Sequence, residues 1–151
     1  MADVFTAAKR SEVMSRIRSH GNRDTELRMI ALLRDHRITD WRRGTNLPGK
    51  PDFVFRSARV AVFVDGCFWH GCRCHGHTPR SNQRYWVAKL ARNKARDRAI
   101  NRELRTRGWA VLRVWECALT RKRQAATLRR LAAALMKRNG TGSHKRQRFA
   151  G

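Results

Sequence analysis

The segment that decides the fold reads Leu47-Pro-Gly-Lys-Pro-Asp-Phe-Val-Phe-Arg-Ser-Ala-Arg-Val-Ala-Val-Phe-Val-Asp65. Its first five residues predict a turn, because Pro51 keeps Lys50 out of the helical region and suits the first residue of a strand. Two short apolar runs follow, at 53–55 and 60–64, and both consist mainly of β-branched and aromatic residues. Runs of this kind are typical of buried strands, so we expect a β-hairpin.

Helices and two further strands are expected on either side of this hairpin. Asp24 or Thr25 can cap a helix that reaches about His36. Its apolar face is expected to hold Leu27, Ile30 and Ala31, with Leu33 beside them. The other elements are a short strand over 39–43, a helix over 82–106, a strand over 109–115 and a helix from about Thr120. This order predicts an α/β fold, a single domain whose mixed β-sheet is flanked by helices.

The length of 151 residues corresponds to one domain. We expect a flexible N-terminus over 1–8, a folded domain over 9–136 and a basic, flexible C-terminal tail over 137–151. No apolar stretch is long enough to span a bilayer. Residues 1–10 contain no apolar signal core, so we expect a cytoplasmic protein without a membrane partner.

The charge balance is strongly positive. The chain has 35 Lys and Arg residues against 11 Asp and Glu residues, a formal net charge of +24. This excess argues against an ordinary metabolic enzyme for small neutral substrates. It favours a polyanionic partner, with nucleic acid ahead of a membrane surface.

Four cysteines fall into one group, Cys67, Cys72, Cys74 and Cys117. Four thiolates satisfy tetrahedral zinc and leave no open position, which is typical of a structural site. The Gly- and His-rich segment after Cys67 needs such a clamp, because it has almost no apolar residues to fix it. A histidine could replace one thiolate, the candidates being His70, His75 and His77. Alternatively, Cys117 is a small buried hydrophobe.

Carboxylates are scarce, so the two at the hairpin ends stand out. Asp52 opens the first buried strand and Asp65 ends the second, and in a hairpin these ends can be close. Two neighbouring carboxylates make a site for Mg2+, with Glu26 as a possible third member. The alternative is two turn residues and a favourable acid in the first turn of a helix. His70 could act as a general base or acid, or be a spare zinc ligand.

Adjacent aromatic residues lie inside the cysteine-rich segment. Phe68 and Trp69 could stack on bases or wedge into a base step, or both could close a small core over the zinc. Trp86 is more often a core residue, but its place beside this segment leaves a binding role open. Trp109 and Trp115 alternate on one strand, and we assign them to the core.

Three motifs together resemble the very short patch repair (Vsr) endonucleases. They are Leu47-Pro-Gly-Lys-Pro-Asp-Phe-Val54, Val62-Phe-Val-Asp-Gly-Cys-Phe-Trp-His-Gly-Cys72 and Gly108-Trp-Ala-Val-Leu-Arg-Val-Trp-Glu-Cys117. The resemblance covers residues 9–119, in order and at matching spacings.

This resemblance implies a fold related to the type II restriction endonucleases, the PD-(D/E)XK group. It implies Mg2+-dependent nicking of duplex DNA 5′ to the T of a T:G mismatch, which starts very short patch repair. Such mismatches arise by deamination of 5-methylcytosine. The implied partners are therefore a cytosine-5 DNA methyltransferase and mismatch-repair proteins, and the enzyme itself is expected to be a monomer at the bacterial nucleoid.

The resemblance also implies a role for each matching residue. Asp52 would hold Mg2+ with the main-chain carbonyl of Val64, and His70 would be the catalytic histidine, supported by Glu26. The zinc ligands would be Cys67, Cys72, Cys74 and Cys117. The aromatic residues that enter the DNA beside the mismatch would be Phe68, Trp69 and Trp86. Met14 would insert from the other groove, and Lys89 and Asn93 would contact the recognised bases.

Two positions depart from the family pattern. Asp65 stands where the best-studied type of member has a second histidine, and an aspartate there could bind Mg2+ directly. Cys72 stands where a histidine can be the zinc ligand. Two other functions therefore stay open: a restriction or defence nuclease that cuts matched DNA, and a zinc-stabilised DNA-binding module without catalysis.

Overall fold

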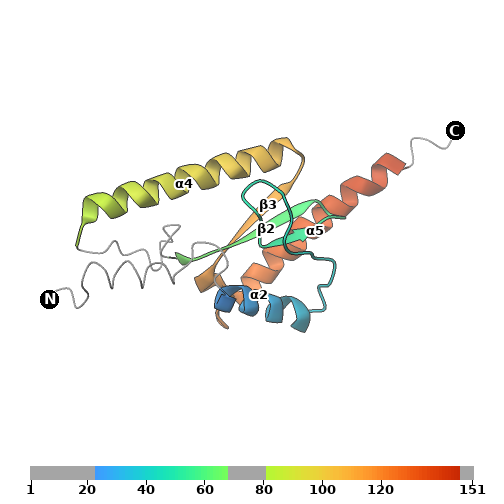
Figure 1. Cartoon of the computed structure of the whole chain (residues 1–151). Coiled ribbons are helices and arrows are strands. Elements are labelled where there is room, and N and C mark those ends of the chain that lie inside the picture. Colours follow the sequence, from blue (N-terminus) through green and yellow to red (C-terminus); the bar gives the residue numbers. More distant parts are fainter. Residues whose placement is uncertain (1–22, 68–80, 147–151) are drawn as a thin grey trace.

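The computed structural model describes residues 23–67 and 81–146 (Figure 1). Three strands form one mixed sheet in the order β1-β2-β3. The elements in chain order are α2 (Arg23–Asp35), β1 (Phe53–Phe55), β2 (Val60–Asp65), α4 (Gln83–Thr106), β3 (Ala110–Trp115), the 3-10 helix η1 (Glu116–Leu119) and α5 (Gln124–Arg146). The α/β class, the single sheet and the flanking helices agree with the sequence prediction.

The predicted hairpin is confirmed. Strands β1 and β2 are antiparallel, with Phe53 opposite Val62 and Phe55 opposite Val60. Strand β3 then pairs in parallel with the other side of β2. A parallel neighbour needs a long crossover, and α4 supplies it.

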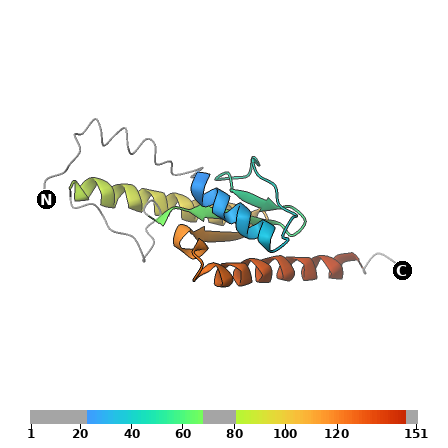
Figure 2. The same cartoon turned by 90° about the horizontal axis from the view of Figure 1, so that it is seen from below.

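The central strand β2 divides the interior into two cores. Val60 and Val62 face α2 and α5, where Leu33 and Leu131 are fully buried. Ala61 and Phe63 face the other way and pack with Leu104 of α4. Figure 2 shows the sheet seen from below, with the long helices α4 and α5 on different sides of it. Alternation along one strand thus sets which helices cover which face.

The strand expected over 39–43 is reduced to one bridge. Arg42 and Val54 exchange both backbone hydrogen bonds, each of 2.9 Å. The Trp41 N–H donates instead to the Thr39 carbonyl, which turns the chain before a longer ladder can form.

The expected apolar face of α2 is confirmed for Leu33, which is fully buried, and for Ile30, which packs partly buried against the core, but it is wrong for Leu27 and Ala31. The buried residues are Met29, Leu32 and Leu33, whereas Leu27 is half exposed and Ala31 is exposed. Apolar residues run without a break from 29 to 33. The sequence period therefore does not fix which side faces the core. Asp24 and Thr25 are themselves helical residues of α2, so the prediction that one of them caps the helix is wrong.

Helix α5 differs from the prediction at both ends. It begins at Gln124 rather than about Thr120, because η1 and a turn occupy the preceding residues. It continues to Arg146, so residues 137–146 are helical although their composition, with Gly140 and Gly142, suggested a loose tail. The domain boundaries at 8/9 and 136/137 stay predictions. In the part of the chain that the structure describes, no helix could cross a membrane.

The turn before β1 packs on α4. The Lys50 N–H donates to the Leu47 carbonyl at 3.0 Å, and Gly49 has a φ of +73°. This pattern, with proline before the glycine, is a type II turn. A Cβ atom on Gly49 would lie 2.5 Å from Cγ2 of Ile100, so the turn and the helix are in close contact.

We predict that Gly49→Ala destabilises the protein more than Gly44→Ala does. Both glycines have positive φ, +73° and +67°, but an added Cβ at Gly44 meets nothing within 4 Å. Both variants should lose about 1–2 kcal/mol from the backbone conformation. Gly49→Ala should lose roughly 1–3 kcal/mol more, because the stiff Ile100 side chain must move. Urea unfolding measures both values, and equal losses would contradict the contact.

Candidate functional site

Two carboxylates from different elements meet beside the hairpin. Asp52 precedes β1, and its Oδ2 accepts a hydrogen bond of 2.7 Å from the Val64 N–H of β2. Glu26, in the first turn of α2, shares a side-chain hydrogen bond with Asp52. The hairpin register and the docking of α2 therefore bring these two predicted site residues together.

The surroundings of Asp52 raise its pKa from 3.8 to about 6. Burial is the largest cause, and the charge and hydrogen bond of Glu26 raise the pKa further. The hydrogen bond from Val64 opposes this shift, and the charge of Asp65 adds the smallest contribution. A buried carboxylate beside a second one is costly to ionise. A bound cation would relieve that cost, so the pair has the chemistry of a hard-metal site.

Glu26 is held from its other side as well. Arg43, in the loop before β1, donates a hydrogen bond to Glu26 Oε2 and forms an ion pair with it. The Glu26 side chain is only 12% exposed, whereas that of Arg43 is 45% exposed. Arg43 therefore fixes Glu26 toward Asp52 and supplies a positive charge at the rim of the site.

Asp65 has a different neighbourhood. It is 4% exposed, and both of its carboxylate oxygens accept hydrogen bonds of 2.9 Å from Nη1 of Arg113. Alternation along β2 places Asp65 on the same face as Phe63, toward α4. The two acids at the hairpin ends are near enough for their charges to interact, but Asp65 is engaged by an arginine.

Two of the four predicted zinc ligands lie together at the carboxyl ends of parallel strands. Cys67 follows β2 and Cys117 lies in η1 after β3, and both are buried. The Cys117 N–H donates to Cys67 Sγ at 3.4 Å, and Arg123 Nη1 lies 3.6 Å from Cys117 Sγ. The two sulfurs are therefore close to each other, with a backbone N–H and a guanidinium beside them. This pair therefore fits one half of a zinc site.

The acidic pair and the cysteine pair each contribute two candidate metal-binding side chains. Within residues 23–67 and 81–146, no three His, Cys, Asp or Glu side chains form a cluster that could hold a metal ion. Cys72 and Cys74 lie outside the described residues, so the complete zinc set stays a prediction. Magnesium commonly uses one or two protein carboxylates with water and backbone oxygens, which the pair of Asp52 and Glu26 can supply.

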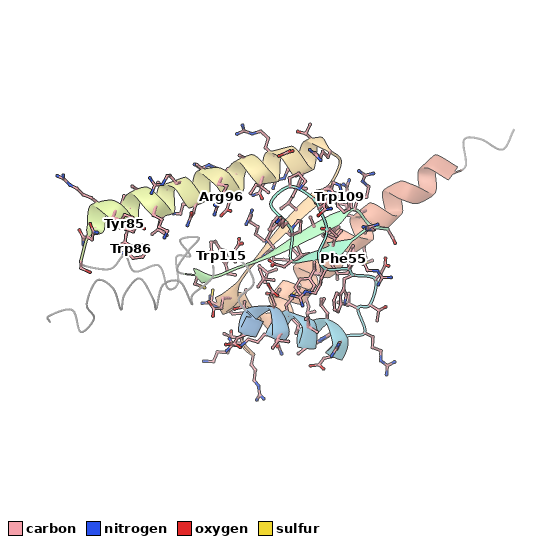
Figure 3. All side chains as sticks on the ribbon, in the orientation of Figure 1. Phe55, Tyr85, Trp86, Arg96, Trp109 and Trp115 are labelled. Atoms are coloured by element: carbon pink, nitrogen blue, oxygen red, sulfur yellow. The ribbon has the colours of Figure 1, made fainter. Side chains whose placement is uncertain are left out.

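Helix α4 carries three of the predicted DNA contacts on its first half. Trp86 and Asn93 are buried, with 5% and 9% exposure. Lys89 Nζ lies 5.5 Å from the centre of the Trp86 ring and 5.6 Å from that of Tyr85. Figure 3 shows Tyr85 and Trp86 at the N-terminal end of α4, and Trp115 at the carboxyl end of the strands.

The exposed surface of α4 is strongly basic. Its exposed arginines and lysine are Arg84, Arg92, Lys94, Arg96, Arg98, Arg102 and Arg105. Exposed cations distributed along a helix can bind the phosphates of a nucleic acid. This surface agrees with the partner class that the net charge favours.

Several predicted site residues lie outside the described part of the chain. They are Met14, Phe68, Trp69, His70, Cys72 and Cys74. Their roles stay predictions.

Three arginines with contacts to site residues were missed by the sequence reasoning: Arg43, Arg113 and Arg123. A signal existed for Arg113, since it is the one charged residue in the apolar run Ala110–Trp115. A lone arginine in a buried strand needs a partner. The other two lie in charge-rich segments, where no pattern distinguishes them.

Comparison with known proteins gives one consistent result. The family model described as DNA mismatch endonuclease Vsr matches residues 2–76. The DNA mismatch endonuclease Vsr of Escherichia coli (strain K12) is 40% identical over 122 residues, covering 79% of this chain and 76% of that protein. The Type II nicking enzyme V.XorIIP of Xanthomonas oryzae pv. oryzae is 38% identical over 122 residues, with coverage of 80% and 88%. V.NaeI of Lentzea aerocolonigenes, also a Type II nicking enzyme, is 55% identical over 75 residues, 50% of this chain and 45% of that enzyme.

We predict that Asp52→Asn stabilises the protein relative to the wild type as the pH rises. The folded pKa of Asp52 is raised from 3.8 to about 6. Protonation therefore favours the folded state, and this contribution is present below pH 4 and lost as the pH rises through 6. Without added divalent metal, the stability difference between Asp52→Asn and wild type should grow by up to about 3 kcal/mol from pH 4 to 7. Urea unfolding at each pH checks this, and a constant difference would refute the crowding of the two acids.

Proposed function

The chain belongs to the Vsr family of DNA mismatch endonucleases, and it is accordingly a nuclease that acts on DNA. From this premise we propose that it nicks duplex DNA 5′ to the T of a T:G mismatch in a Mg2+-dependent reaction. The nick starts very short patch repair at mismatches left by deamination of 5-methylcytosine. The enzyme then works as a monomer in the cytoplasm, beside a cytosine-5 DNA methyltransferase and mismatch-repair proteins.

The pairing of Asp52 with Glu26 is the observation that carries the catalytic part of this proposal. Asp52 would hold Mg2+ together with the main-chain carbonyl of Val64, whose N–H already contacts the Asp52 carboxylate. When bound there, Mg2+ stabilises charge on a scissile phosphate and lowers the pKa of coordinated water. Asp65 is the weaker candidate ligand, because both of its oxygens accept from Arg113.

His70 completes the proposed catalytic group. It would orient or deprotonate the attacking water, and Glu26 would support it. The support for this role is the position of Glu26, which lies between Asp52 and Arg43 and is largely buried. A carboxylate fixed on both sides can hold a histidine in one tautomer and orientation.

A structural zinc ion is proposed for the four cysteines. Cys67 and Cys117 would hold it with Cys72 and Cys74. The ion would clamp the segment that carries Phe68, Trp69 and His70 to the carboxyl ends of β2 and β3. The buried pair of sulfurs, with a backbone N–H and Arg123 beside them, supports this assignment.

Recognition is proposed to use α4 and the aromatic residues near its start. The exposed basic surface of α4 would attract the duplex through its phosphates. Lys89 and Asn93 would contact the recognised bases. Trp86, Phe68 and Trp69 would test whether a base step opens easily, with Met14 entering from the other groove. A wobble pair costs less to unstack than a matched pair, so the mismatch is favoured.

We predict cutting of only the T strand, and only in the mismatched duplex, when each strand is labelled separately. Asp52→Ala should lower the nicking rate by at least about a hundredfold, because a metal ligand is lost. Its DNA affinity should change by less than about threefold, since the exposed arginines and lysine of α4 are unchanged. Asp40→Ala is the matched control, because Asp40 is an exposed carboxylate whose partner is Ser57.

Three outcomes would contradict this assignment in different ways. Nicking by Asp52→Ala at the wild-type rate would rule out the metal site. Cutting of both strands or of the matched duplex would identify a restriction or defence nuclease. Binding without cutting, in every methyltransferase-site context supplied, would identify a non-catalytic DNA-binding module.

We predict that Cys117→Ala loses zinc and stability together. The wild type should carry about one zinc ion per chain, and the variant almost none. Cys117→His is the conservative comparison, because histidine also binds zinc, and it should retain more metal than the alanine variant. Metal analysis and thermal unfolding measure both effects. A folded Cys117→Ala protein with full zinc content would refute the site.

A further inference from the structure

A half-buried arginine on β3, Arg113, contacts three polar side chains on two other elements, β2 and α4. The Arg113 side chain is 17% exposed. Its Nη1 donates to both oxygens of Asp65, at the end of β2, and its Nε donates to Asn101 Oδ1 on α4 at 2.9 Å. Its Nη2 lies 3.5 Å from Asp97 Oδ1, also on α4. One guanidinium therefore joins the sheet to the crossover helix.

The surroundings of Arg113 leave it little freedom. Its Cζ atom lies 4.3 Å from the centre of the Phe63 ring, and Phe63 is 1% exposed. A buried guanidinium is stable only when its charge and its fork of donors are matched. Most of that match is present here, because Asp65 and Asn101 accept hydrogen bonds from Nη1 and Nε. Within the described part of the chain, Nη2 has no hydrogen-bond partner and is balanced by the charge of Asp97 at 3.5 Å. The Phe63 ring fixes the plane of the group.

Arg113 links the proposed metal site, at the end of β2, to the proposed DNA contacts on α4. Asp65 directly follows Val64, whose N–H binds Asp52. Asp97 and Asn101 lie one to two turns after Asn93 on α4. We infer that Arg113 is a positioning residue: it holds α4 at a fixed register against the carboxyl end of β2. It thereby sets where the DNA-reading half of α4 lies relative to Asp52. This inference rests on the proposed function.

The geometry of α4 makes this register important. In Figure 1 the first half of α4 extends past the strands, and the second half lies over the sheet. Ile100 and Leu104 pack on the sheet from that second half. Trp86 is eleven residues before Asp97, which is about 16 Å along a helix. A small rotation at Asp97 therefore moves Trp86 by a larger distance.

The same geometry gives Asp65 a role as the anchor of Arg113. A metal ion at Asp65 would compete with Arg113 for the same two oxygens. Lysine could not replace Arg113, because a single ammonium cannot reach Asp65, Asp97 and Asn101 with the geometry of a planar fork. The inference therefore assigns Asp65 to the support of the site, and leaves Asp52 as its principal ligand.

The test compares two variants with one matched control in the full-length, zinc-loaded protein. Arg113→Lys keeps the charge but loses the fork, and Asp97→Asn keeps the pair of Arg113 with Asp65 while weakening the link to α4. Glu103→Gln is the control. Glu103 is also an acid on α4, but it pairs with Arg107 in an exposed contact of 2.7 Å within the same chain segment. Asp97→Asn keeps the test decisive if Arg113→Lys fails to fold.

Two readouts separate positioning from general stability. Hydrogen exchange reports α4 directly, and amides over 86–101 should exchange at least about tenfold faster in both variants than in the control. The single-turnover nicking rate on the T:G duplex should fall about tenfold or more, with less than about threefold change in Kd, because the DNA still binds but is misplaced.

Each result decides the inference. Unchanged exchange in α4 for both variants would overturn it. A nicking rate that stays at the wild-type value while α4 exchanges faster would also overturn it, because α4 would then be held without consequence for the reaction. If the wild-type protein does not nick T:G duplexes, the proposed function fails. The exchange of α4 amides would still show whether Arg113 holds the helix.

Discussion

The rest of the structure depends on the burial of β2 between two strands and two layers of helices. Its odd and even positions face different cores, so one register fixes α2 and α5 on one side and α4 on the other. Its carboxyl end places Asp65 and Cys67 beside the Asp52 carboxylate and Cys117. The antiparallel partner supplies the acid, and the parallel partner supplies the second sulfur. A shift of one residue in this strand would exchange the two faces and separate both sites.

Much of this fold could be predicted because turn residues and strand composition are local signals. The turn at 47–50 and the runs at 53–55 and 60–64 identify the hairpin without any knowledge of the rest. The phase of α2 could not be predicted, since Met29 to Leu33 is continuously apolar. The strand over 39–43 was overestimated, because a backbone hydrogen bond between Trp41 and Thr39 depends on the loop conformation.

The candidate site also has a part that the sequence could predict and a part that it could not. Asp52 and Glu26 could be singled out because acids are rare in this chain, and the structure brings them together. The different orientation of Asp65 follows from strand alternation, which the pattern contains, but its partner Arg113 lies far along the chain. An ion pair between residues far apart in the sequence leaves no local pattern from which it could be predicted. The family resemblance indicated which positions belong to the site, whereas the contacts of Asp65 could be seen only in the folded structure.

The course of α5 has a practical consequence for surface chemistry. In Figure 1 this helix leaves the sheet in the direction opposite to the carboxyl end of β2. Its last turn, near Arg146, therefore lies on the far side of the molecule from Asp52 and the two cysteines. A dye, an affinity handle or a solid support attached beyond this helix is kept away from the acidic pair and from the first half of α4. The protein can thus be immobilised in a single orientation, with the edge that is proposed to face DNA left free.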